Sequence, residues 1–314
     1  MNKCLYCYKE IVQGNNFHKR CALDFFGTKK VPELNYSFNE MQKLAMDVVE
    51  RSISVPGVQP KLSMSLSNNI ENESNQRLTV VGALGGNYIF KPPNSNFVEM
   101  PENEHLTMRI AEAYGINVVK SSLIYLKSGE LSYITKRIDR KNDGSKIHMI
   151  DMFQITEAFD KYKSSMERVG KALGDYTSNT LLDKLFLFEL TLFSFLTGNN
   201  DMHLKNFSMI KSDFGWALSP AYDLLNVTIV NPEDSEELAL TLSGKKKNIT
   251  KNNFVDFGRK LGLTNKQIDS VFSRFSKNKI KAIQLIESSF LSSKMKDRYL
   301  SVLEKRYSRL NEDF

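Results

Sequence analysis

The segment 198–210, GNNDMHLKNFSMI, gathers an Asp, a His, a Lys and an Asn in six positions directly after the apolar run at 181–197. Apolar surroundings do not tolerate such groups without partners. A carboxylate at Asp201 can accept a proton, and the side-chain oxygen of Asn206 can bind a hard cation such as Mg²⁺. The types and spacing of these residues therefore favour a catalytic loop over a structural turn.

Phosphoryl transfer by kinases requires parts that this chain contains in the expected order. Asp201 and Asn206 are five residues apart, as are the base and the metal-binding Asn of a kinase catalytic loop. Asp223, in SPAYDLLN, follows at the distance expected for a second metal-binding Asp. We interpret Asp201 as the base for a substrate hydroxyl, and Asn206 and Asp223 as ligands of Mg²⁺.

Residues that would bind the phosphates of ATP lie upstream of this loop. Lys91 ends the strand-like YIF and would act on the α- and β-phosphates as a point charge. Glu102 and Glu104 open the next helix, and Glu104 is the better candidate to pair with the lysine. The loop SVPGVQ, which contains Gly57 and precedes Lys61, would cover the nucleotide.

A second group of residues at the amino terminus has the composition of a metal site. All three cysteines of the chain, Cys4, Cys7 and Cys21, lie in the first 21 residues together with His18, one of four histidines. The spacing C-x2-C-x10-H-x2-C predicts a structural Zn²⁺ with four protein ligands and no position for water. Ordinary buried cysteines are the alternative, and an odd cysteine count disfavours a disulfide framework.

The elements that must position these residues fall into two groups. Up to about residue 139 we expect helices at 38–52 and 101–114, with strands in SISVPGVQPKLSMSLS, LTVVG, NYIFKPP, SSLIYL and LSYITKRI. Beyond Asp151 we expect helices, including a buried one at 181–197 and a carboxyl-terminal series from Thr250 to Leu310 broken near Gly262 and Asn278. A polar, turn-rich region at about 198–245 interrupts these helices and contains one strand-like segment, GWALSP.

The predicted fold class is α+β, with a two-lobed, protein-kinase-like architecture. The predicted domains are a zinc knuckle with its linker (1–35), a β-rich smaller lobe (36–139) and a mainly helical larger lobe (140–314), with Lys136-Arg137-Ile138-Asp139 as the hinge. A chain of 314 residues with 41% apolar content can form these cores.

Composition limits the function less than the motifs do. The net charge of +7 favours anionic partners only mildly. The apolar run at 181–197 contains Asp183, Lys184 and Glu189, which argues against a membrane span. The amino terminus lacks the apolar core of a signal peptide. We therefore expect a cytoplasmic protein without a membrane partner.

These motifs together resemble the HipA-like bacterial serine/threonine kinases, the toxins of toxin–antitoxin systems. The resemblance extends from about residue 40 to the carboxyl terminus and rests on SVPGVQPKLS, FKPP, PENEHLTMRIAEAYGINVV, KRIDR, GNNDMHLKNFS and SPAYDLLN. It implies ATP and Mg²⁺ as cofactors and the architecture of phosphatidylinositol-kinase-like enzymes, whose catalytic loops also read D-x-H-x-x-N.

The resemblance also implies roles for individual residues. Backbone groups of Lys136 and Ile138 would contact adenine, Asp139 would lie near the ribose, and Lys61 would be the lysine of the Gly-rich loop. His203 and Lys205 would support the catalytic loop and contact phosphate. Autophosphorylation would occur in the Gly-rich loop, at Ser54 or Ser52, and would switch the enzyme off by charge repulsion.

The chain has about fifty residues before the Gly-rich loop, which is similar to the short HipT form of the family. That form implies antitoxin partners of the HipS and HipB types, with DNA bound only through the HipB-like protein. The family implies an aminoacyl-tRNA synthetase as substrate, the tryptophanyl or the glutamyl enzyme. Two alternatives stay open: a lipid or small-molecule kinase with the same catalytic parts, and a noncatalytic nucleic-acid-binding module, which predicts salt-dependent binding and no ATP turnover.

Overall fold

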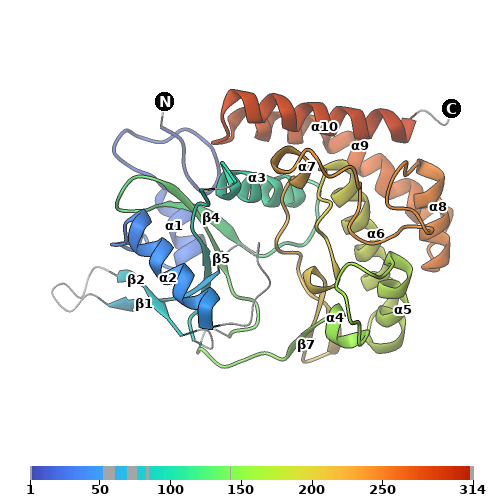
Figure 1. The fold of residues 1–314 in the computed structure, drawn as a ribbon, viewed down its shortest axis with the longest axis horizontal. Helices are drawn as coiled ribbons and strands as arrows, with labels where there is room; N and C mark the ends of the chain where they lie inside the picture. Colours follow the sequence, from blue (N-terminus) through green and yellow to red (C-terminus); the bar gives the residue numbers. More distant parts are fainter. Residues whose placement is uncertain are drawn as a thin grey trace. The chain divides into compact units, whose positions relative to one another are not determined.

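The chain forms two compact units (Figure 1). The computed structural model describes residues 2–51, 61–68, 76–82, 85–95, 97–141 and 143–311, without the side chains of 47–51 and 311. Unit 1 consists of Met1–His105, Val119–Ser145 and Ser288–Phe290, and unit 2 consists of Leu106–Val118, Lys146–Glu287 and Leu291–Phe314. The predicted α+β class is confirmed, whereas the predicted domain boundaries at residues 35 and 139 stay predictions.

Unit 1 is built on a five-stranded antiparallel sheet of order β2-β1-β3-β5-β4. Its strands are β1 (Leu62–Asn68), β2 (Gln76–Val81), β3 (Tyr88–Lys91), β4 (Ser121–Tyr125) and β5 (Leu131–Lys136). The register pairs Leu62 with Phe90 and Phe90 with Ile134, so that these apolar side chains share one buried face. The strand patterns in the sequence therefore identified this sheet.

Unit 1 also contains helices, two of which pack onto the same core. They are α1 (Lys19–Phe26), α2 (Phe38–Arg51) and the first part of α3 (Met100–Ala113), whose later residues belong to unit 2. Phe25 and Phe26 of α1 and Met41 of α2 are buried in the core that contains the sheet residues. The predicted helices at 38–52 and 101–114 are confirmed, whereas α1 was not predicted.

Unit 2 contains a small antiparallel sheet of order β6-β7-β8, formed by Met149–Asp151, Ser208–Ser212 and Gly215–Leu218. The short helix α4 (Met152–Ile155) follows β6, and the 3₁₀ helix η1 (Leu204–Asn206) precedes β7. The predicted polar, turn-rich region therefore includes a hairpin. Its first strand was missed because SMIKS has too few apolar residues to show alternation.

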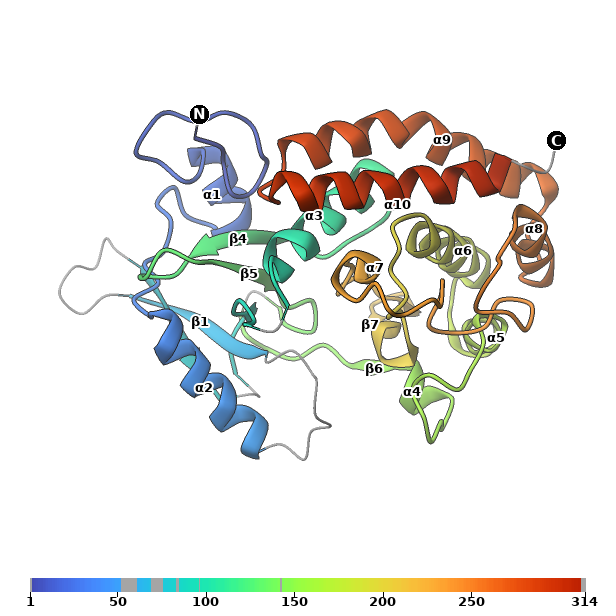
Figure 2. The same cartoon turned by 45° about the horizontal axis from the view of Figure 1, so that its top comes forward.

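The remaining elements of unit 2 are helices: α5 (Met166–Tyr176), α6 (Thr180–Leu196), α7 (Val227–Val230), α8 (Lys251–Lys260), α9 (Asn265–Ser288) and α10 (Ser293–Asn311). Helix α6 is apolar around most of its circumference and is buried by α5, α8 and α10, as the sequence predicted. Figure 2 shows α9 and α10 side by side, and Tyr307 Oη donates to Phe275 O between them.

The predicted helix break near Asn278 is wrong. Helix α9 continues through this residue to Ser288, and the chain leaves the helix only before α10. One asparagine costs a helix interior less than about 1 kcal/mol, and the buried residues Phe275 and Ala282 on either side of it continue one apolar face. The predicted break near Gly262 is confirmed, because it separates α8 from α9.

Candidate active site

The catalytic-loop candidate leaves α6 through a turn that requires glycine. Gly198 has φ +68°, and a Cβ at this position would lie 2.8 Å from Asn226 Oδ1. The loop then closes on itself: Asp201 O accepts from His203 N at 2.8 Å and from Asn206 Nδ2 at 2.9 Å. Because a backbone oxygen only accepts, the second bond shows which side-chain atom of Asn206 is the nitrogen. The side-chain oxygen, Oδ1, can then act as a metal ligand. The Asp and the Asn of the motif are thus held in one short loop.

A tyrosine that the sequence did not indicate binds the candidate base. Tyr162 Oη donates to Asp201 Oδ1 at 2.7 Å, and the Tyr162 ring packs edge-on against His203 with centroids 5.0 Å apart. Burial raises the pKa of Tyr162, and the hydrogen bond to the Asp201 carboxylate adds to this effect. Tyr162 therefore stays a donor at neutral pH. It lies 39 residues before Asp201, where no motif marks it.

His203 is a buried residue of the same loop, with an exposed fraction of 6%. Burial is the largest cause of its lowered pKa, and the charge of Lys161 acts in the same direction. The charges of Asp201 and Asp223 oppose this shift, so both carboxylates lie within electrostatic range of the imidazole. Within the described part of the chain, His203 Nδ1 has no hydrogen-bond partner. The geometry favours a neutral imidazole.

Asp223 stands in a segment that hydrogen bonds to the catalytic loop. Ser219 N donates to Ser208 O at 2.8 Å, and Tyr222 Oη donates to Lys205 O at 3.0 Å. Asp223 itself has φ +59°, a conformation that costs an L-residue free energy and that is enriched at functional sites. Asn206 and Asp223 therefore offer hard oxygen donors from two segments that are bonded together, which suits Mg²⁺.

The predicted ion pair of unit 1 is present in its interior. Lys91 Nζ lies 2.6 Å from Glu104 Oε1, and the two side chains are only 3% and 1% exposed. The Lys91 ammonium also lies 5.4 Å from the centre of the Tyr133 ring. Lys91 ends β3 and Glu104 lies in the first turns of α3, so the sheet and the helix fix the pair. Glu102 does not take this place, and burial raises its pKa to about 7.

The predicted hinge residues are held by a local network of charges. Arg137 binds both carboxylate oxygens of Asp139, at 2.9 and 2.7 Å, and Arg140 Nη1 binds Oδ2 at 2.6 Å. Burial alone would raise the pKa of Asp139, but the hydrogen bonds and charges of the two arginines hold it below its ordinary value. Both oxygens expected near a ribose are thus engaged by arginine. Lys136 N is bonded to Lys120 O, and Ile138 follows in a bend.

The remaining predicted residues are more dispersed. Lys205 is exposed, with Nζ 4.8 Å from the centre of the Phe153 ring, and Lys61 is exposed immediately before β1. Ser52, Ser54 and Gly57 lie outside the described residues. The four amino-terminal Cys and His residues converge in unit 1, with their ligand atoms all within 4.8 Å of one another.

A unit built on an antiparallel sheet with a buried Lys–Glu pair, and a helical unit with a D-x-H-x-x-N loop, define the class of kinase-like proteins. The chain belongs to the HipA-like family: the family's model, described as the HipA-like C-terminal domain, matches residues 53–283. The family resemblance found in the sequence is thereby confirmed. The HipT subform stays a prediction.

Relatives with kinase names support this placement. A protein of Haemophilus influenzae named "Putative kinase" is 27% identical over 310 residues, which are 89% of this chain and 88% of that protein. The "Serine/threonine-protein kinase toxin HipA" of Shewanella oneidensis is 27% identical over 207 residues, which are 59% of this chain and 45% of that protein. The chain is thus homologous to kinases of the toxin type.

Solved structures confirm the predicted kinase-like fold. A chain of the Shewanella oneidensis HipA, HipB and operator DNA complex matches with a TM-score of 0.71 and 23% identity, over 96% of this chain and 80% of that one. The Helicobacter pylori proinflammatory kinase CtkA matches with a TM-score of 0.53 and 18% identity, over 72% of this chain and 88% of that one. Among the described helices, none combines the length and the apolar composition needed to cross a membrane.

Proposed function

We propose that the chain is an ATP- and Mg²⁺-dependent protein serine/threonine kinase that acts as the toxin of a toxin–antitoxin system. The observation that carries the proposal is the closed loop at 201–206, in which Tyr162 orients the Asp201 carboxylate and Asn206 Nδ2 is bonded to Asp201 O. The family and its kinase-named members support the same chemistry.

In this proposal Asp201 accepts the proton of the substrate hydroxyl as phosphate is transferred. Asn206 and Asp223 hold Mg²⁺, which when bound neutralises charge on the transferring phosphates. Lys91 contributes a positive charge to the α- and β-phosphates, and Glu104 keeps the lysine side chain in one orientation. Neutral, buried His203 supports the loop by packing inside it, and exposed Lys205 can contact phosphate.

The proposed substrate is an aminoacyl-tRNA synthetase, the tryptophanyl or the glutamyl enzyme, whose modification would stop translation. Autophosphorylation at Ser52 or Ser54 would place about −1.5 to −2 charges on the Gly-rich loop and inhibit nucleotide binding. The proposed antitoxin partners are of the HipS and HipB types. The likeness to a chain of a complex that contains HipB and operator DNA supports the HipB-type partner. DNA would be reached only through that partner, and the proposed location is the cytoplasm.

The proposal is tested by intact-mass spectrometry of the purified wild type, Asp201→Asn and Asp213→Asn, before and after incubation with ATP and Mg²⁺. Asp213 is an exposed aspartate in the β7–β8 turn and provides the matched control. We expect the wild type and Asp213→Asn to gain phosphate that maps to Ser52 or Ser54, and Asp201→Asn to gain none. Phosphorylation by Asp201→Asn at the wild-type rate would refute the assigned base.

The substrate is tested by offering the same three proteins purified tryptophanyl- and glutamyl-tRNA synthetase, a lipid mixture and a metabolite mixture, each with labelled ATP. Transfer to one synthetase that depends on Asp201 supports the proposal. Transfer to a lipid or metabolite but to no protein would establish the alternative kinase class. Binding of RNA or DNA without any ATP turnover would establish the noncatalytic module.

A further inference from the structure

The four Cys and His residues of the amino-terminal segment lie far along the chain from every residue of the proposed kinase chemistry. We propose that Cys4, Cys7, His18 and Cys21 bind one structural Zn²⁺, and that this metal holds a brace between Tyr8 and α3. The proposal rests on the geometry of unit 1 and does not depend on the proposed kinase activity.

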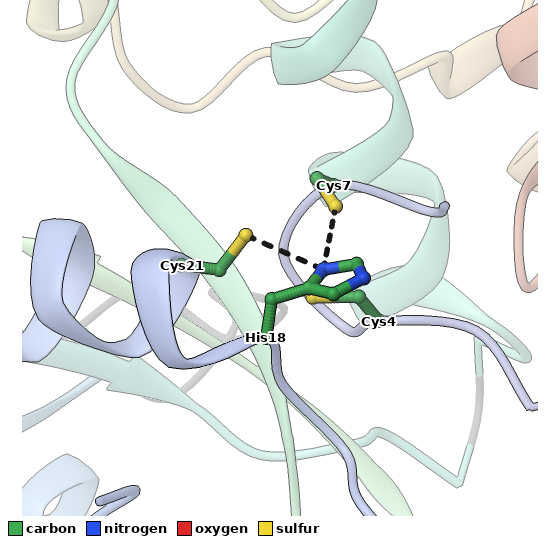
Figure 3. A group of neighbouring side chains, drawn as sticks. All are labelled: Cys4, Cys7, His18 and Cys21. Atoms are coloured by element: carbon green, nitrogen blue, oxygen red, sulfur yellow. Dashed lines mark hydrogen bonds between the residues drawn. The ribbon is translucent and has the colours of Figure 1, made fainter. Parts of the chain in front are cut away.

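Two sulfur–nitrogen distances within the cluster match those of a tetrahedral zinc site. Zinc binds thiolate at about 2.3 Å and imidazole at about 2.0–2.1 Å, so a sulfur and a nitrogen on the same ion are about 3.5 Å apart. The Sγ atoms of Cys7 and Cys21 lie 3.4 and 3.7 Å from His18 Nδ1. Figure 3 shows the four side chains pointing toward one another. Three sulfurs and one nitrogen, all within 4.8 Å of one another, therefore converge closely enough to bind one ion.

The local fold brings two ligand pairs to this point. Cys4 and Cys7 lie on a tight turn in which Tyr8 N donates to Cys4 O at 3.0 Å and Tyr8 adopts φ +64°. His18 is the N-cap of α1, and Cys21 lies in its first turn. Thiolates near a helix amino terminus are stabilised by the helix dipole. The turn and the helix start thus supply two ligands each.

The histidine has the outer contact that zinc-binding histidines require. His18 Nε2 lies 2.9 Å from Glu10 O, a backbone acceptor on the strand-like pair that closes the knuckle. A carbonyl oxygen can only accept, so Nε2 carries the hydrogen and Nδ1 presents its lone pair to the cluster. Such a contact fixes the tautomer and the ring orientation of a metal ligand. A buried cysteine cluster without metal does not explain this arrangement.

The knuckle is connected to the first turns of α3. Tyr8, the residue after Cys7, shares a buried hydrogen bond of 2.9 Å with His105 Nδ1, and the two rings pack edge-on at 5.2 Å. His105 directly follows Glu104, the partner of Lys91. Loss of the metal would free the turn at Cys7 and loosen the Tyr8–His105 contact. Zinc therefore stabilises the helix end that positions the buried ion pair.

The chain offers an unusually clean test, because its three cysteines all belong to the cluster. The full-length protein is analysed for metal by inductively coupled plasma mass spectrometry and for thiol reactivity with Ellman's reagent. We expect about one zinc per chain, and thiols that react slowly until a strong chelator is added. The wild type is also reconstituted with Co²⁺, whose absorption reports tetrahedral thiolate ligation even if variants fold poorly.

The variants separate the ligands from their surroundings. Cys21→Ser is expected to lose at least tenfold in zinc affinity, whereas His18→Cys retains zinc because a thiolate replaces the imidazole. His148→Gln, at an exposed histidine outside the cluster, is the matched control and keeps zinc. The zinc site is refuted if the reconstituted wild type holds far less than one zinc, if the chelator leaves thiol reactivity unchanged, or if Cys21→Ser binds zinc as the wild type does.

The brace is tested separately by hydrogen exchange of the backbone amides at 102–105, which follow Pro101. Removal of zinc is expected to speed this exchange at least severalfold. Tyr8→Phe is expected to do the same while it keeps zinc, because it removes only the hydroxyl that contacts His105. Equal exchange in the zinc-loaded protein, the zinc-free protein and Tyr8→Phe would refute the brace and leave the metal site standing.

Discussion

The buried pair of Lys91 and Glu104 predicts a large loss of stability when one charge is removed. Glu104→Gln keeps the shape of the side chain but takes the carboxylate charge away from a lysine that is only 3% exposed. Breaking a buried pair in this way costs about 3–5 kcal/mol, because the remaining charge stays desolvated. Total stabilities are about 5–15 kcal/mol, so the variant should lose a large share of its margin.

Removing both charges should restore most of that loss. In Lys91→Met/Glu104→Leu, apolar side chains of similar size replace the pair, and such replacements are often neutral or stabilising. The contact of the ammonium with Tyr133, at 5.4 Å, is also lost, which costs about 0.5–2 kcal/mol. The double variant should therefore be more stable than Glu104→Gln by about 2–4 kcal/mol. Under the proposed function it should still fail to bind ATP, because the charge proposed to contact the phosphates is gone.

Equilibrium unfolding in urea measures the stability of each variant. The nucleotide-dependent shift of the unfolding temperature measures its ATP binding. The matched control is Asp24→Asn, which breaks an exposed ion pair of unit 1 with Lys120 and should cost no more than about 1 kcal/mol. A cost of Glu104→Gln no larger than that of Asp24→Asn, or a double variant no more stable than the single one, would show that the buried charge is not what destabilises the protein.

Two further predictions follow from single residues. Gly198→Ala should be less stable than the control Gly262→Ala by about 1–3 kcal/mol in urea unfolding, because both have positive φ but only Gly198 has atoms within 3 Å of the added Cβ. Glu102 has a pKa raised by burial to about 7, so its protonated form stabilises the fold at low pH and this contribution is lost as pH rises from about 4.5 to 7. Glu102→Gln should therefore raise the unfolding temperature at pH 8 and leave it nearly unchanged at pH 5. Equal effects at the two pH values, or equal losses in the two glycine variants, would contradict these statements.

The spacing of apolar residues along the chain was sufficient to predict most of the individual helices and strands. The apolar periodicity at 38–52 predicted α2, and the short β-branched and aromatic runs predicted strands of unit 1, because each element buries one face. Lys91 and Glu104 were paired correctly because a strand end and a helix start allow few partners. Asn278 did not break its helix, because a continuous buried face outweighs the weak helix propensity of one residue.

Contacts between distant segments could not be predicted from the sequence. Tyr162 reaches Asp201 across 39 residues, and Tyr222 bonds to Lys205 O across 17. A tyrosine in a polar loop has no spacing rule, so neither partner could be identified before the segments were placed together. The bidentate Arg137–Asp139 contact was also missed, although both residues lie in the predicted hinge. The pairing depends on the bend of the backbone between them.

The polar residues that follow α6 show how an apolar helix can end in a reactive loop. Asn199 is fully buried and its Oδ1 accepts from Asp201 N at 3.3 Å, while Asn200 Nδ2 donates to Asp234 Oδ2 at 3.0 Å. Buried polar groups cost free energy unless they are bonded. The bond from Asp201 N to Asn199 holds the backbone at Asp201, and the bonds of Asn200 connect the preceding residue to Asp234 and Glu236. One bond that satisfies a buried polar side chain after α6, from Asp201 N to Asn199 Oδ1, thus also positions the backbone of the candidate base. A substitution at Asn199 or Asn200 should therefore change the geometry of the loop, although neither side chain is proposed to contact a substrate.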